Sequence, residues 1–246
     1  MGTFWIVPVL SREEFDAIEF TAAFSGEHEA AAQRMSRLAV TGTQSASMPR
    51  AEAFLRAGEQ WLLADDPAAA ASGFRLALAD GGPVFVDPRV PLSRALFLLG
   101  KSAEAQALIS KLKAEGRRDP RACDLVAELL VERCDLPGAL DWATAGVELC
   151  LQREAGRDAP LHPGGPEPDL AGDDPAELRL LLSLRYRIRN DLGLPEDDYD
   201  RLLDETPSGG AGERVARTVS ESDAASTSTM TSLPSAMSPD SKPRAS

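Results

Sequence analysis

The sequence predicts an all-α protein: a short α-solenoid of antiparallel helix pairs with capping helices and a disordered C-terminal tail. Ala and Leu dominate the 246 residues, only 5% of the residues are aromatic, and no run of alternating β-branched residues predicts a strand. A small residue, Ala70, recurs in an equivalent setting at Ala105 and Ala139, at separations of 35 and 34 residues. A fixed period of this size indicates stacked helical units that bury a common core.

The first unit, residues 54–77, sets the pattern. Each unit is expected to be two helices of about three turns joined by a short turn. Asp66 caps the second helix of the first unit, and Pro67 occupies its first position. Small residues at Gly58 and Ala70 allow the two helices to approach closely. Beside this crossing, bulky side chains are expected to fill the space: Phe54, Trp61 and Phe74.

This spacing resembles the tetratricopeptide repeat, in which bulky, small, aromatic and alanine positions recur over about 34 residues. The matching residues are Phe54, Ala57, Gly58, Trp61, Ala70, Phe74 and Ala77. The second and third units keep the small residue at the crossing but lose the aromatic residues. The resemblance implies an array of stacked helix pairs, and the alternative is an ordinary bundle of Ala-rich helical hairpins.

Residues 1–48 are predicted to form an arm followed by a helical pair. Ser11 and Glu14 have the spacing of a capping box, which predicts a helix over about residues 12–24. A second helix is expected over about residues 27–40. Such a layer would cover the apolar side of the first repeat. The apolar start has no basic segment before it and no cleavage site, so we do not expect a signal peptide.

The repeat array is predicted over residues 49–152, and residues 84–86 inside it are expected to pack as a short extended plug between prolines. A flexible Gly- and Pro-rich loop is expected at residues 153–174, followed by a C-terminal capping helix within residues 175–205. From residue 206 to residue 246 the chain is rich in Ser, Thr and Pro. It has too few large apolar residues to offset chain entropy, so this tail is predicted to be disordered.

The end of the predicted array carries a second resemblance. The stretch RYRIRNDLGLPEDDYDRLLDE, behind an Ala- and Gly-rich array, looks like a group of actinobacterial tetratricopeptide-like proteins. Many of those continue into a SEC-C motif, a small Cys- and His-rich zinc module. No Cys or His follows Asp204 here, so that module is not expected. The acidic residues 196–200 are expected to form exposed ion pairs with nearby arginines, which would contribute little stability.

Motifs for catalysis are missing from the sequence. It has no glycine-rich phosphate loop and no Gly-x-Ser-x-Gly elbow, and its acidic pairs precede prolines at helix starts, where capping explains them. His28 and His162 stand without neighbouring ligands, so we expect no metal, no cofactor and no enzyme. One alternative is an enzyme or regulatory subunit that uses the loop at residues 153–174. Another is a structural subunit that self-associates.

The net charge of −13 disfavours nucleic acid as a partner, because an acidic body repels phosphates. No apolar stretch approaches the ~20 residues of a membrane span. Three cysteines, an odd number without zinc or disulfide spacing, predict a reducing, cytoplasmic compartment. One local basic cluster is expected to be a solvated turn, or alternatively a docking patch for an acidic partner: Lys111, Lys113, Arg117, Arg118 and Arg121.

The predicted function is that of a non-catalytic scaffold or adaptor that binds a peptide or helix of a partner protein. The tetratricopeptide resemblance implies a concave groove lined by the first helix of each unit. The groove positions, transferred by register, are Leu55, Glu59, Leu62, Val90, Arg94, Phe97, Asp124, Glu128 and Val131.

An apolar stripe flanked by carboxylates, with Arg94 as the single cation of this set, suits a segment with apolar anchors and basic flanks. Family members that bind a C-terminal carboxylate use Lys and Asn in this groove, and neither residue type occurs at these positions. The alternative is that Leu62, Phe97 and Val131 only pack against neighbouring helices.

Overall fold

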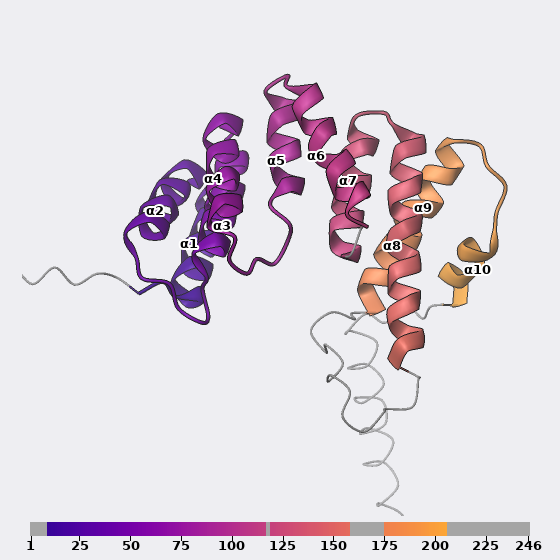
Figure 1. Ribbon diagram of the computed structural model, residues 1–246, viewed down its shortest axis with the longest axis horizontal. Helices are drawn as coiled ribbons and strands as arrows, with labels where there is room; N and C mark the ends of the chain where they lie inside the picture. The colour runs from indigo at the N-terminus through magenta and orange to yellow at the C-terminus, as the bar shows by residue number, and fades with distance from the viewer. Residues whose placement is uncertain (1–8, 117–118, 158–174, 206–246) are drawn as a thin grey trace, which may run out of the picture. The chain divides into compact units, whose positions relative to one another are not determined.

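The computed structural model describes residues 9–116, 119–157 and 175–205 (Figure 1). The predicted arm before residue 9, most of the predicted loop with His162, and the predicted tail lie outside the described residues. The described residues confirm the all-α prediction, since their one extended pairing is an isolated bridge between Val9 and Thr43. Their helices are α1 (Arg12–Ser25), α2 (His28–Thr41), α3 (Arg50–Leu63), α4 (Pro67–Asp80), α5 (Arg89–Leu98), α6 (Ser102–Ala114), α7 (Pro120–Glu132), α8 (Leu136–Arg157), α9 (Pro175–Asp191) and α10 (Asp198–Glu205).

The helices pack in consecutive pairs, α1 with α2, α3 with α4, α5 with α6 and α7 with α8. Contacts of α2 with α3 and of α4 with α5 join the first three pairs, and α9 packs on α8 and α7. The first helices of the second and third predicted units, α5 and α7, also touch each other directly. This arrangement is a helical, repeat-like fold.

The small residues at the predicted helix crossings lie in the core. Ala70, Ala105 and Ala139 are each 0% exposed, and Gly58 is buried between α3 and α4. A larger side chain at these positions would force the paired helices apart, because core packing leaves few voids. The period of about 34 residues in the sequence therefore corresponds to the repeated close approach of two helices.

The helix starts follow from capping chemistry. The Asp66 carboxylate accepts hydrogen bonds from the backbone N–H groups of Ala68 and Ala69, at 3.1 and 2.9 Å, before Pro67 begins α4. Only half of the predicted capping box at Ser11 is formed. The Ser11 hydroxyl accepts from the backbone N–H of Glu14 at 3.2 Å, but the Glu14 carboxylate forms an ion pair with Arg34.

Two predicted details of the array differ in the structure. The segment predicted as a plug buries Val86, which is 8% exposed, but leaves Phe85 64% exposed, because the chain alternates its side chains between the core and water. The helix α8 continues to Arg157, five residues beyond the predicted end of the array at residue 152. The first part of the predicted loop is therefore helical.

The predicted exposed pairs near the C-terminus are a buried network. Arg185 of α9 is 4% exposed and Asp200 of α10 is 7% exposed. The Arg185 guanidinium donates to Asp197 and Asp200, and Arg189 also contacts both carboxylates. The two arginines and two aspartates link α9 to the start of α10. Removal of one partner would leave a buried charge unpaired, which is costly, so the network favours this packing.

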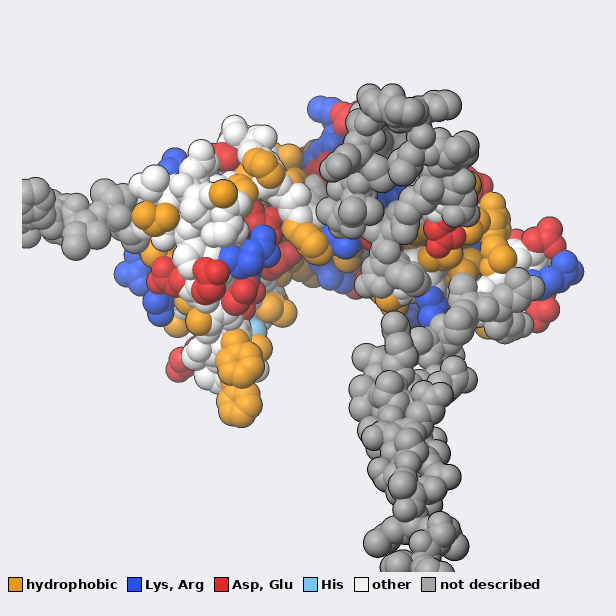
Figure 2. Space-filling model, turned by 90° about the horizontal axis from the view of Figure 1, so that it is seen from below, with side chains coloured by type: hydrophobic (Ala, Val, Ile, Leu, Met, Phe, Trp, Pro, Cys, Tyr) orange, Lys and Arg blue, Asp and Glu red, His pale blue; other side chains and the backbone are white. Residues whose placement is uncertain are grey.

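The N-terminal pair buries one side of each helix and leaves two aromatic side chains in water. Phe15, Ile18 and Ala22 of α1 face the core, whereas Phe20 and Phe24 are 74% and 90% exposed. Figure 2 shows hydrophobic side chains projecting from the N-terminal part of the molecule. In the described part of the chain, none of the helices is both long enough and apolar enough to span a membrane.

Candidate peptide-binding groove

A small pocket brings together helices α3, α5 and α7. It has a volume of about 130 Å³ and is lined by five of the nine residues that the sequence places in a groove: Glu59, Leu62, Val90, Arg94 and Glu128. Four further residues complete its walls: Val86, Pro91, Leu125 and Leu129. The direct contact between α5 and α7 and the linker before α5 position these side chains around one opening.

The pocket has the size and lining of a site for one apolar side chain. Cavities of about 150 Å³ with apolar walls accept a molecule as large as benzene. Leu62, Val86 and Val90 supply apolar walls, and Glu59 and Glu128 line the pocket with side chains that are exposed to water. An apolar anchor with a polar group beside it would therefore match this surface.

The other four predicted groove residues lie outside the pocket. Leu55 is 2% exposed and packs in the core, so it offers no surface to a ligand. Val131 is half-buried against the same core, and Asp124 is half-buried on α7. Phe97 is also half-buried, with the guanidinium of Arg133 at 5.2 Å from the centre of its ring. Packing thus accounts for Leu55 and Val131, and of these two only Val131 belongs to the alternative interpretation in which Leu62, Phe97 and Val131 pack against neighbouring helices.

Glu59 occupies a concave, acidic position. Protein surrounds it on several sides, although its side chain still contacts water. This partial loss of solvation is the main cause that raises the pKa of Glu59, to about 7, and the like charges of Glu19 and Glu52 raise it further. Within the described part of the chain, Glu59 forms no ion pair.

A second acidic position lies on α7. Burial raises the pKa of Asp124 to about 6, and the neighbouring charges of Glu128 and Glu177 raise it further. Glu128 lies one helical turn from Asp124, and among the described residues it too has no cation paired with it. Glu59 on α3 and Glu128 on α7 therefore line the pocket, and neither forms an ion pair with another described residue.

Arg94 does not neutralise these carboxylates. It forms an ion pair with Glu132, which lies on the exposed surface of α7. Arg94 is the only cation among the described residues that line the pocket. Because Glu132 pairs with Arg94, the charge of Glu128 and the ionised form of Glu59, whose pKa is about 7, remain available to a ligand.

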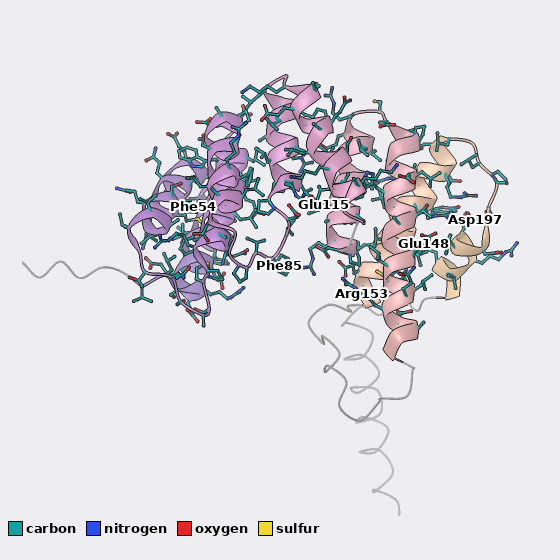
Figure 3. The ribbon with its side chains drawn as sticks, viewed as in Figure 1. Phe54, Phe85, Glu115, Glu148, Arg153 and Asp197 are labelled. Atoms are coloured by element: carbon teal, nitrogen blue, oxygen red, sulfur yellow. The ribbon has the colours of Figure 1, made fainter. Side chains whose placement is uncertain are left out.

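The linker between α4 and α5 lies beside the pocket, and Figure 3 shows Phe85 on it. The Arg121 guanidinium lies 3.8 Å from the centre of the Phe85 ring, and the Glu52 carboxylate accepts a hydrogen bond from the Phe85 backbone N–H at 2.8 Å. The linker is thus tied to α3 and α7 while it contributes Val86 to the pocket. Phe85 and Arg121 were not predicted as neighbours, because they are far apart in the sequence.

The described residues offer no group of His, Cys, Asp and Glu that could hold a metal ion. His28 is half-buried, and its Nδ1 lies 3.0 Å from the Oε1 of Gln60, a hydrogen bond that joins α2 to α3. None of the three cysteines forms a disulfide bond, and Cys123 and Cys150 are buried as small core residues.

No family model matches the sequence, and no curated protein matches it. Among solved structures, the chain resembles the crystal structure of BtubC (BKLC) from P. vanneervenii, with a TM-score of 0.50 and 12% sequence identity. The likeness covers 94% of this chain and 87% of that chain. At this identity the likeness supports the class of fold, a helical and repeat-like protein.

Proposed function

We propose that this chain is a non-catalytic interaction module of the tetratricopeptide type, a scaffold or adaptor whose groove on α3, α5 and α7 binds a peptide or helix of a partner protein. The observation that supports it is the pocket of about 130 Å³, in which apolar walls lie beside the carboxylates of Glu59 and Glu128, neither of which forms an ion pair among the described residues. The repeat spacing of the sequence and the helix pairs of the fold agree with this class.

The pocket favours a particular ligand chemistry. One apolar side chain of the partner would fill the space between Leu62, Val90 and Leu129. A lysine or arginine of the partner, next to that apolar side chain, could form ion pairs with Glu59 and Glu128. The net charge of −13 would further attract a basic segment. The absence of disulfide bonds among the three cysteines fits a reducing, cytoplasmic setting for this activity.

A library of peptides tests the proposal without knowledge of the natural partner. Each peptide carries one leucine, isoleucine or phenylalanine flanked either by lysine and arginine or by glutamate, and binding is measured by fluorescence anisotropy. We expect the basic-flanked peptides to bind, and binding to weaken by about tenfold or more when Glu59→Lys and Glu128→Lys are combined.

A charge-matched control separates the groove from the general charge of the molecule. Glu148→Lys combined with Glu154→Lys makes the same change in net charge at two exposed positions of α8. This control is expected to bind like the wild type, and circular dichroism should show all three proteins folded. Equal binding of acidic-flanked peptides, or equal weakening in both double variants, would contradict the proposal.

A further inference from the structure

The sequence after α10 contains a segment with the chemistry that the pocket on α3, α5 and α7 favours. Arg214 and Arg217 stand on either side of Val215, so an aliphatic side chain lies between two cations. The other two basic residues of the tail, Lys242 and Arg244, enclose only a proline. The match between pocket and tail is therefore confined to one short stretch, Arg-Val-Ala-Arg-Thr-Val at residues 214–219.

The side chain of Val215 suits the size of the pocket. The pocket has a volume of about 130 Å³ and is walled by aliphatic side chains, among them Leu62, Val90 and Leu129. A cavity of about 150 Å³ accepts a molecule as large as benzene, and the isopropyl group of valine is smaller than benzene. Val215 would therefore bury its apolar surface there without any widening of the pocket.

The charges of the segment complement those of the pocket. Glu59 and Glu128 line the pocket, and neither forms an ion pair with another described residue. The segment 214–219 carries two positive charges and no negative one. A guanidinium can donate two parallel hydrogen bonds to a carboxylate, so arginines on both sides of a bound valine would pair with the two glutamates.

The length of chain beyond α10 is also suitable. Arg214 follows Glu205, the last residue of α10, by nine residues, and an extended chain of that length spans at most about 30 Å. The Asp200–Arg185 pair joins α10 to α9, and α9 packs on α7, which lines the pocket. Packed helices have axes about 8–10 Å apart, so two such steps are shorter than the available chain.

We propose that residues 214–219 are an internal ligand of the pocket, with Val215 between its apolar walls and the two arginines on Glu59 and Glu128. A partner must then displace this segment before it can bind, so the chain inhibits its own interaction site. This inference rests on the proposed function, because it assigns a competing ligand to the same pocket.

The experiment measures the binding of the basic-flanked library peptides to the full chain by fluorescence anisotropy. Arg214→Glu with Arg217→Glu removes the two cations, and Val215→Ser removes the apolar anchor without a change of charge. Both variants should bind the library peptides about fivefold more tightly than the wild type. A segment that fills the pocket in about four of five molecules weakens the apparent affinity by this factor.

Lys242→Glu with Arg244→Glu is the matched control, because it makes the same change of charge elsewhere in the tail. It should bind the library peptides like the wild type. Equal tightening in both double variants, or no tightening in Val215→Ser, overturns the inference and leaves the proposed function in place. If no library peptide binds to any of these proteins, the proposed function fails and the inference falls with it.

A synthetic peptide of residues 210–222 provides a direct measurement. It should bind to the full chain that carries Arg214→Glu with Arg217→Glu, whose own segment no longer competes. Addition of Glu59→Lys with Glu128→Lys to that protein should weaken binding of the peptide by about tenfold or more. The inference is wrong if the peptide does not bind to a protein that binds the library peptides.

Discussion

The ring of Phe74 covers Gly58 so closely that a Cβ atom on residue 58 would lie 2.5 Å from Cε1 of that ring. On the facing helix, a Cβ atom on Gly73 would lie 3.3 Å from the Cα atom of Gly58. The closest approach of α3 and α4 therefore depends on the absence of a side chain at Gly58, with a buried aromatic ring filling the space above it.

Replacing Gly58 by leucine should overpack this contact and lower the free energy of unfolding by roughly 1–3 kcal/mol or more. Urea denaturation measures the change. The control is Ala68→Leu, which adds the same side chain at an exposed position of α4 and should change stability by less than about 0.5 kcal/mol. A Gly58→Leu protein as stable as the wild type would mean that α3 and α4 do not approach each other at this residue.

The acidic groove should leave a signature in the pH dependence of stability. The pKa of Glu59 rises from 4.5 to about 7 on folding, so the folded state holds the proton more strongly than the unfolded state. The free energy of unfolding should therefore fall as the pH rises from 4.5 to about 7, and this contribution stays constant above that. Because water screens the exposed side chain, we expect an effect on the order of 1 kcal/mol.

The comparison of wild type with Glu59→Gln isolates this contribution, since Asp124 adds a slope of the same sign in both proteins. Glutamine keeps the shape of the side chain and removes its titration. Glu59→Gln should therefore be the more stable protein at pH 8 and nearly equal to the wild type at pH 4. Parallel curves for the two proteins between these pH values would show that the groove does not perturb Glu59.

The buried network between α9 and α10 should be sensitive to the loss of Arg185. Arg185→Met removes one of the two guanidinium partners of Asp200, which is 7% exposed. We expect a loss near the lower end of ~3–5 kcal/mol because Arg189 still contacts Asp200. Hydrogen exchange should report faster opening of α10. Arg201→Met, which removes a pair on the outer surface, should change stability by under about 1 kcal/mol.

The packing of α9 on the array gives a further prediction. Leu181 is 0% exposed and lies against Gly146, where a Cβ atom would be 2.7 Å from its Cδ2. Leu181→Ala should lower the free energy of unfolding by about 2–5 kcal/mol, because it leaves a cavity between α9 and α8. Weaker packing of α9 would expose the apolar end of the array and promote aggregation. Leu180→Ala is the matched control, since Leu180 is 61% exposed. Equal melting temperatures for the two variants would contradict a capping role for α9.

Much of the fold follows from chemistry that is local in the sequence. The recurring small residues and caps such as Asp66 depend on neighbours a few residues away, so the helix pairs could be predicted. The register of the repeats also placed Glu59, Val90 and Arg94 on one surface, and these three residues line one pocket. Leu55 shows the limit of that register, because it lies in the core.

Features that depend on distant contacts could not be predicted. The stacking of Arg121 on Phe85 joins a linker to a helix 36 residues further on, and no local pattern indicates it. Exposed ion pairs were predicted between residues 196–200 and nearby arginines, but the packing of α10 buries one of these arginines, Arg185. The exposure of Phe20 and Phe24 could not be predicted from the sequence, because the helix also contains Phe15 and Ile18, and only the packing shows that these two are the core residues.

Because each helix touches mainly the helices next to it in the chain, folding closes short loops, which cost little entropy. One helix pair can form before the others and then act as the surface on which its neighbour assembles. Under a pulling force the same arrangement should open one pair at a time from an end. Force spectroscopy would then record a series of small extensions in place of one large rupture.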